Sequence, residues 1–313
     1  HPGSPARVVG RDGDLRDVVG ELPFLLKLLA AGAPLSLQTH PTAAQARAGF
    51  AREDAAGIPR DAPQRNYKDP HAKPEMILAL SEEFRALSGF RPVAATRAVL
   101  DAAAPGLLSD LHADADLPSV VERLLTTDVG AEVAALVTVA RDADGDSWAS
   151  VRLLAEHHPG DAGIAVSLLL NTVVLRRGEA LYLPAGNIHA YLAGLGVELM
   201  GPSDNVLRAG LTPKHVDVAE LLAVVDFTPV ADPRLTPRPR DGVLAFTPAG
   251  AGWELLDLRG ETTLAVGDPA LLVIVDGSAS AEEVTVTAPG FAAAADTVVD
   301  ARGRVLVARS ATA

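Results

Sequence analysis

Polar and apolar side chains alternate with a period of two over residues 34–41, the pattern of a β-strand with one polar face. That face carries Ser36, Gln38 and His40. A glutamine and a histidine two residues apart on one strand face can both reach a single ion, although the pattern also suits a half-exposed strand whose polar side chains face water. Pro41 ends the strand, and residues 42–52 have the pattern of a helix capped by Thr42.

The spacing of Gly178, Pro184, Gly186 and His189 predicts a strand, a tight turn and a return strand. Residues 180–183 form the first strand. Pro184 cannot donate to a sheet ladder and Gly186 permits a tight corner, so the chain reverses there. His189 then begins the return strand, at the mouth of a barrel where small β-barrels hold ligands. A buried structural histidine is the alternative.

A lysine and a glutamate flank a proline at Lys73-Pro74-Glu75. Pro74 pushes Lys73 into an extended conformation, which predicts a strand in which Lys73 and Glu75 share a face. An ordinary ion pair explains a carboxylate beside an ammonium equally well. Taken with the glutamine and the two histidines above, Glu75 supplies the fourth ligand of a metal site built from nitrogen and oxygen donors.

An almost continuous apolar run over residues 21–31 is interrupted by Lys27, and a run this short suits a buried strand as well as a helix. An ammonium there is costly unless it reaches a polar cavity or an anion; the alternative is a head group that reaches solvent. The chain has only four lysines, which are Lys27, Lys68, Lys73 and Lys214. Because arginine supplies the other cations, a lysine marks a place where a compact or titratable amine is wanted, unless the bias is merely compositional.

Alanine and leucine dominate residues 81–159, with helical spacing in residues 81–87, 119–125 and 131–140. We interpret this segment as an α-helical insertion, and its histidines as structural or exposed: His112, His157 and His158. Residues 160–171 return to strand character. The segment 219–313 has short Val-, Leu- and Thr-rich runs between Gly, Pro and Asp, typical of an all-β unit, with its clearest strand and turn at 270–277. This part lacks a His/Glu cluster, so we expect a second barrel without a metal.

The formal net charge of −13 argues against nucleic acid and anionic membrane surfaces as partners. An anionic substrate therefore needs a local basic pocket. The sequence has no cysteine, which excludes disulfides and thiolate zinc sites and fits a reducing cytoplasm. No apolar run reaches the roughly 18 residues of a membrane span, and the beginning of the chain lacks the layout of a signal peptide.

Four segments together resemble the type I mannose-6-phosphate isomerases (phosphomannose isomerases) of the cupin superfamily. They are residues 36–41 (SLQTHP), 67–75 (YKDPHAKPE), 184–191 (PAGNIHAY) and 204–214 (DNVLRAGLTPK). The resemblance covers essentially the whole chain, and it implies a mainly β fold of two cupin-type (jelly-roll) barrels with an α-helical insertion. Residues 1–80 with 160–218 would form the catalytic barrel, 81–159 the insertion and 219–313 a metal-free barrel. Family members carry further strands before residue 21, so we expect part of the first barrel to be missing from this chain.

The resemblance also implies a zinc-dependent aldose–ketose isomerase that interconverts mannose 6-phosphate and fructose 6-phosphate through a cis-enediol. One Zn²⁺ per chain would be bound by Gln38, His40, Glu75 and His189, the set reached above from strand faces and spacing. The catalytic residues would be Arg208, Lys73 and Asp204, and the sugar phosphate would be held by Lys27, Ser36 and Lys214. Lys73 could act as the base if the metal and burial depress its pKa. We expect a monomeric cytoplasmic enzyme.

One departure from the family pattern concerns ring opening. The family has Asn-His before Lys-Pro-Glu, whereas this chain has His71-Ala72. We do not transfer the ring-opening role to His71, because a strand would point it to the opposite face. Two other functions stay open: a non-catalytic sugar-phosphate-binding cupin, and a metal-dependent cupin oxygenase with iron on a similar ligand set. The pair Arg208 and Lys214, suited to phosphate, argues against the oxygenase.

Overall fold

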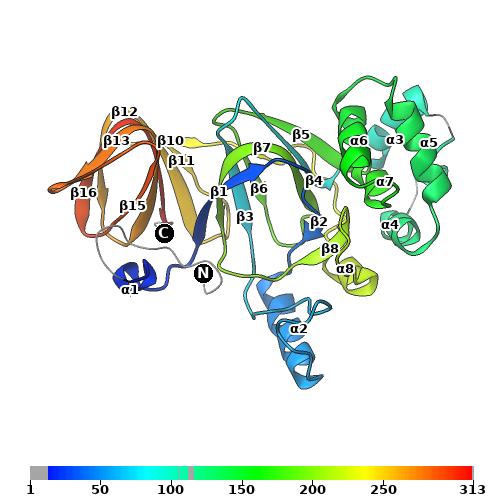
Figure 1. The fold of residues 1–313 in the computed structure, drawn as a ribbon, viewed down its shortest axis with the longest axis horizontal. Helices are drawn as coiled ribbons and strands as arrows, with labels where there is room; N and C mark the ends of the chain where they lie inside the picture. The colour runs from blue at the N-terminus through cyan, green and yellow to red at the C-terminus, as the bar shows by residue number, and fades with distance from the viewer. Residues whose placement is uncertain (1–12, 105, 112–115, 312–313) are drawn as a thin grey trace.

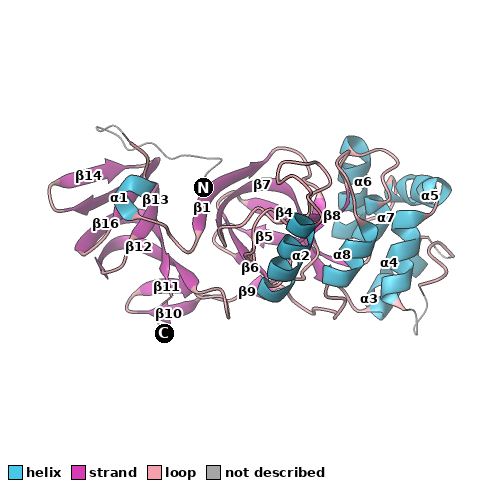
Figure 2. Cartoon of the chain, turned by 90° about the horizontal axis from the view of Figure 1, so that it is seen from below, coloured by secondary structure: helices cyan, strands magenta, loops and turns pink. Residues whose placement is uncertain are grey.

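The computed structural model describes residues 13–104, 106–111 and 116–311, and its two antiparallel sheets confirm the predicted mainly β fold (Figure 1). The sheets lie side by side along the longest axis of the molecule, and most of the helices gather at the far end of the first sheet (Figure 2). No helix within the described ranges is long and apolar enough to cross a membrane.

The first sheet is built around one long strand, β7 (His189–Met200). The start of β7 pairs with β2 and β4, while its second half pairs with β1 and β3. The other strands of this sheet are β1 (Leu25–Ala31), β2 (Leu37–Thr39), β3 (Glu75–Ala79), β4 (Glu83–Phe90), β5 (Leu170–Arg176), β6 (Ala180–Leu183), β8 (Leu207–Gly210) and β9 (Arg234–Leu235). Strands from two distant parts of the sequence, residues 25–39 and 75–90, therefore meet on β7.

The second sheet is made by the C-terminal part of the chain. Its strands are β10 (Arg238–Arg240), β11 (Val243–Phe246), β12 (Trp253–Val266), β13 (Ala270–Ala281), β14 (Val284–Thr287), β15 (Gly290–Ala294) and β16 (Thr297–Ser310). A buried apolar cluster joins the two sheets: Phe24, Met76 and Val197 from the first pack with Phe246 and Trp253 from the second.

The helices are α1 (Arg16–Val19), α2 (Ala43–Ala55), α3 (Val93–Ala103), α4 (Leu117–Thr126), α5 (Gly130–Ala140), α6 (Asp146–His157), α7 (Gly163–Ser167) and α8 (Val218–Val224). Helix α2 begins as predicted, with a reciprocal capping box between Thr42 and Gln45. The predicted helices at 119–125 and 131–140 are α4 and α5. Helices α3 to α7 bury their apolar faces in one core with Leu37 of β2 and with Ile188, which precedes β7.

Three local predictions are wrong. In the predicted helix at 81–87, residues 83–87 instead form part of strand β4, because pairing with both β5 and β7 outweighs the local helical spacing. The segment 160–171 contains helix α7 before β5 begins at Leu170. Strand β13 continues through the turn expected at 276–277; Gly277 is needed there because a Cβ would lie 2.0 Å from the Arg302 carbonyl oxygen.

Two histidines of the helical segment lie within the described residues. His157 is exposed, and His158 Nε2 lies 3.3 Å from the Pro34 carbonyl oxygen. His112 falls outside the described residues.

Candidate metal centre

Three buried side chains converge where β2, β3 and β7 begin or end. His40 follows β2, Glu75 begins β3 and His189 begins β7, and each is only 1% exposed. His40 Nε2 lies 3.1 Å from Glu75 Oε1, and His189 Nε2 lies 3.3 Å from Glu75 Oε2. One ligand atom from each residue lies within 4.8 Å of the other two, a spacing that suits a single metal ion.

Main-chain carbonyl groups fix the orientation of both imidazole rings. His40 Nδ1 lies 2.7 Å from the carbonyl oxygen of Asn205, and His189 Nδ1 lies 3.0 Å from that of Asn187. A carbonyl oxygen can only accept a hydrogen bond, so each Nδ1 carries the proton and donates it. In the neutral rings the lone pair then sits on Nε2, which faces Glu75, the arrangement found in metal-binding histidines.

The charges at this cluster favour a cation. Burial lowers the pKa of His40 to about 4, so its ring is neutral at pH 7. Burial opposes ionisation of Glu75, but Lys73 and the histidines hold the pKa of Glu75 well below its usual value. The 3.1 Å contact between His40 and Glu75 is therefore not an ion pair, because the lone pair of the neutral Nε2 faces a carboxylate oxygen.

Three buried atoms at the centre also lack hydrogen-bond partners among the residues that the structure describes. These atoms are His40 Nε2, Glu75 Oε2 and His189 Nε2. Buried polar atoms are almost always satisfied, so three orphans that face one point require a ligand. Two nitrogen donors and one carboxylate fit a divalent cation such as zinc, which is commonly bound by such donors.

The proposed fourth ligand, Gln38, lies on the same sheet face as His189. Its Cα is paired in register with His189 on β7 and with Arg208 on β8, and residues directly opposite each other in a sheet point the same way. Gln38 is half-buried, and its Oε1 accepts a hydrogen bond from Ser36 Oγ at 3.3 Å. The amide oxygen of Gln38 is thus held by its neighbour on the strand.

Lys73 lies at the centre as well. Its Nζ is 2.8 Å from Glu75 Oε1, and the residue is 8% exposed. Burial lowers the pKa of Lys73, but the Glu75 carboxylate raises it more, so the pKa lies above its ordinary value. A general base would need a depressed pKa. The raised pKa instead keeps Lys73 as an ammonium when no metal is bound.

The other proposed catalytic residues come from the 201–208 segment. Arg208 is half-buried on β8, burial lowers its pKa, and it forms no ion pair with any carboxylate of the described chain. Asp204 is exposed, and its backbone N–H donates to Asp69 Oδ2 at 2.9 Å.

The residues proposed to bind phosphate are more dispersed. Lys27 is partly exposed on β1, with its Nζ 3.9 Å from Glu198 Oε2 and 3.8 Å from Met200 Sδ, so its head group reaches solvent beside β7. Lys214 is exposed in the loop after β8. Among the described contacts, neither ammonium bonds to the His40–Glu75–His189 cluster. Ser36 contacts the cluster's strand only through Gln38.

Sequence reasoning missed several buried groups near the centre. Asn187 and Asn205 were assigned no role from the sequence. Tyr191 shares the strand face of His189, a signal available from the period-two pattern, and its hydroxyl is buried. Glu198, farther along β7, is buried, and burial together with the nearby Glu75 charge raises its pKa to about 7.

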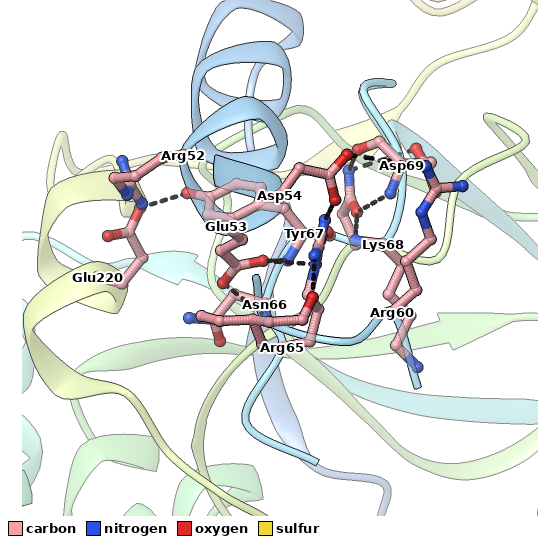
Figure 3. Close-up of polar contacts among 12 residues, drawn as sticks. Arg52, Glu53, Asp54, Arg60, Arg65, Asn66, Tyr67, Lys68, Asp69 and Glu220 are labelled. Atoms are coloured by element: carbon pink, nitrogen blue, oxygen red, sulfur yellow. Dashed lines mark hydrogen bonds and ion pairs between the residues drawn. The ribbon is translucent and has the colours of Figure 1, made fainter. Parts of the chain in front are cut away.

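The loop that leads to Lys73 is anchored by charged groups of α2 and α8 (Figure 3). The Glu53 carboxylate accepts the backbone N–H groups of Asn66 and Tyr67 at 3.1 and 2.9 Å. The Tyr67 hydroxyl donates to Glu220 Oε1 at 2.5 Å, and Arg52 pairs with the same oxygen at 2.8 Å. The loop is therefore fixed to two helices before it reaches the metal centre.

This fold and site define the chain as a metal-centred β-barrel protein with a helical insertion. The family model "Phosphomannose isomerase type I, catalytic domain" matches residues 9–93. The mannose-6-phosphate isomerase of Escherichia coli K12 is 39% identical over 90% of this chain and 80% of its own length, and that of Salmonella typhimurium LT2 is 37% identical over 99% and 88%. The chain belongs to the type I phosphomannose isomerase family.

Solved structures agree with this membership. A crystal structure of mannose 6-phosphate isomerase bound with zinc and yttrium has a TM-score of 0.90 at 34% identity, and the match covers 100% of this chain and 89% of that one. A zinc-bound holo form of mannose 6-phosphate isomerase has a TM-score of 0.85 at 35% identity over 95% and 81%. Both likenesses extend over both sheets and the helices.

Proposed function

We propose that this chain is a zinc-dependent isomerase that interconverts mannose 6-phosphate and fructose 6-phosphate. The observation that carries the proposal is the set of three unsatisfied buried atoms of His40, Glu75 and His189 that face one point. Gln38 completes the ligand set from the neighbouring strand β2. Family membership and the names of the similar proteins supply the substrate pair.

The reaction moves a proton between two adjacent sugar carbons through a cis-enediol. Zinc, when bound, supplies Lewis-acid stabilisation of the substrate oxygens. Arg208 places a fixed positive charge on the same sheet face, where it stabilises the negative charge that develops on those oxygens. Lys73, which contacts Glu75, and Asp204 are the residues we propose for proton transfer and ring opening.

The phosphate group is bound by the two exposed lysines Lys27 and Lys214 together with Ser36. The net charge of −13 repels an anionic sugar phosphate in general, so these local cations decide where the phosphate binds.

The proposal extends to the organisation of the chain. The catalytic barrel consists of the first 80 residues with 160–218, and it gains β4 from the segment first assigned to the helical insertion. The insertion then covers the helices up to residue 159, and residues 219–313 form the metal-free barrel. We propose a monomeric cytoplasmic enzyme that binds neither nucleic acid nor membranes, as the acidic net charge supports.

A coupled assay of mannose 6-phosphate conversion, run on purified protein before and after chelator treatment, tests this function. We expect turnover that chelation abolishes and that Zn²⁺ restores, with about one zinc per chain by elemental analysis. Turnover that persists in metal-free protein would refute the zinc centre. Binding of the sugar phosphate without any turnover would identify a non-catalytic protein instead.

A further inference from the structure

Asn205 is a fully buried asparagine between β7 and β8 whose side chain holds the loop ahead of Lys73. Its Oδ1 accepts the backbone N–H groups of Lys68 and Asp69 at 2.7 and 3.1 Å. Its Nδ2 donates to the carbonyl oxygens of Asp69 and His71 at 2.7 and 2.9 Å. These contacts use both donor hydrogens and both acceptor positions of the amide, so the side chain has one orientation.

The main chain of the same residue orients a proposed metal ligand. The Asn205 carbonyl oxygen accepts the Nδ1–H of His40 at 2.7 Å, which directs Nε2 toward Glu75. This carbonyl cannot move without turning the imidazole ring. The position of the carbonyl depends in turn on the side-chain amide, because both belong to one residue anchored to the loop.

The neighbouring residues make this connection tight. Ser203 Oγ donates to the His71 carbonyl at 3.2 Å and accepts the Asn205 N–H at 3.2 Å. Gly201 donates its N–H to the Pro74 carbonyl at 2.9 Å, and a Cβ at Gly201 would lie 2.8 Å from the Ala72 carbonyl oxygen. The 201–205 segment thus packs directly against the backbone on both sides of Lys73.

We propose that Asn205 is a positioning residue that couples the metal ligand His40 to the catalytic loop of Lys73. Its carbonyl sets the tautomer and direction of the imidazole, and its side-chain amide sets the loop that places the ammonium beside Glu75. The inference rests on the proposed zinc centre. It adds that one residue, which touches neither metal nor substrate, fixes both sides of the Glu75 carboxylate.

The decisive variant is Asn205→Asp, which keeps the size of the side chain and replaces the Nδ2 donor by an oxygen. That oxygen would face the carbonyl oxygens of Asp69 and His71, so the loop and the Asn205 carbonyl must shift. Loss of an outer partner of a metal-binding histidine typically weakens metal affinity or activity by about 10- to 100-fold. We expect zinc affinity, measured by competition with a chromophoric chelator, to fall in that range.

The matched control is Asn171→Asp. Asn171 Nδ2 also donates to backbone carbonyl groups, of which Val230 is the nearest at 2.9 Å, but Asn171 contacts neither imidazole. We expect the control to lose thermal stability while its zinc affinity stays within about twofold of the parent protein. Ser203→Ala is a milder second variant that folds even if Asn205→Asp does not, and it should weaken zinc binding in the same direction.

The visible absorption spectrum of the Co²⁺-substituted protein supplies a readout that stability alone does not change. A shifted His40 ring alters the ligand geometry, so we expect altered band positions in Asn205→Asp and not in Asn171→Asp. Parent-like zinc affinity and Co²⁺ spectra in both Asn205→Asp and Ser203→Ala would overturn the inference. Failure of the parent protein itself to bind zinc would refute the proposed function instead.

Discussion

Replacing Arg208 by alanine should abolish most turnover and leave the metal centre intact. Arg208, Gln38 and His189 are paired in register across β8, β2 and β7 and share one sheet face. With neighbouring strands about 4.8 Å apart, the Arg208 Cα lies about 10 Å from that of His189, and the long side chain spans the space between. None of the ion pairs among the described residues involves Arg208, and only burial shifts its pKa, so its charge is available to the substrate.

The size of the effect follows from the charge that is removed. A guanidinium about 4 Å from a developing negative charge contributes about 4 kcal/mol at an effective dielectric constant of about 20. Each 1.4 kcal/mol or so changes a rate about tenfold, so kcat should fall roughly 1,000-fold. That agrees with the loss of about 100- to 1,000-fold when one oxyanion-stabilising donor is removed. Arg208→Lys should fall between, because lysine keeps the charge and loses the planar fork.

Steady-state kinetics of the coupled isomerase reaction, with zinc content measured on the same samples, checks this expectation. Arg85→Ala is the matched control, because Arg85 is also a half-buried strand arginine but pairs with Asp146 at the helical end. We expect zinc content to match the parent in both variants. A kcat within about fivefold of the parent in Arg208→Ala would remove Arg208 from the chemistry.

Two further predictions concern stability. Glu254 is fully buried, and its Oε1 lies 2.6 Å from Arg240 and 2.9 Å from Arg309. Burial raises the pKa of Glu254, but these partners lower it more. The ion pairs of Glu254 therefore stabilise the fold above pH 4.5, and this stabilisation is lost as the pH falls further. Glu254→Gln should lower the unfolding free energy by about 3–5 kcal/mol at pH 7. It should also reduce the loss of unfolding free energy below pH 4.5, measured by urea titrations at several pH values; a pH dependence equal to that of the parent would contradict this. Gly49→Ala should cost about 1–3 kcal/mol despite the better helix propensity of alanine, because its Cβ would lie 2.4 Å from the Tyr67 ring; an equal or higher midpoint in thermal melts would contradict this.

Short sequence patterns correctly predicted the helices whose signals lie within the helix itself. The capped helix after Thr42 and the two helices at 119–125 and 131–140 were found because caps and helical periodicity operate within a few residues. The sequence also singled out His40, Glu75 and His189 from strand faces, and the structure places their ligand atoms within 4.8 Å of one another.

The wrong predictions share a cause that is not local. Residues 81–87 have helical spacing, but two sheet neighbours hold residues 83–87 as a strand, and such pairing is invisible in a single segment. The pKa of Lys73 also depends on a contact that one segment does not show: burial lowers this pKa, but Glu75 at 2.8 Å raises it more. An opposite charge at contact distance outweighed desolvation, and only the three-dimensional arrangement shows that distance.

The most consequential contacts at the centre come from main-chain atoms. Both imidazole rings are directed by carbonyl groups, from Asn187 two residues before His189 and from Asn205 three residues before Arg208. A carbonyl exists at every position, so no residue type can signal this role in a sequence. Each carbonyl belongs to a turn whose course is fixed by glycine, proline and buried amide contacts. The geometry of the metal centre therefore depends on turns that lie beside the ligands, and substitutions in those turns can alter metal binding without touching a ligand.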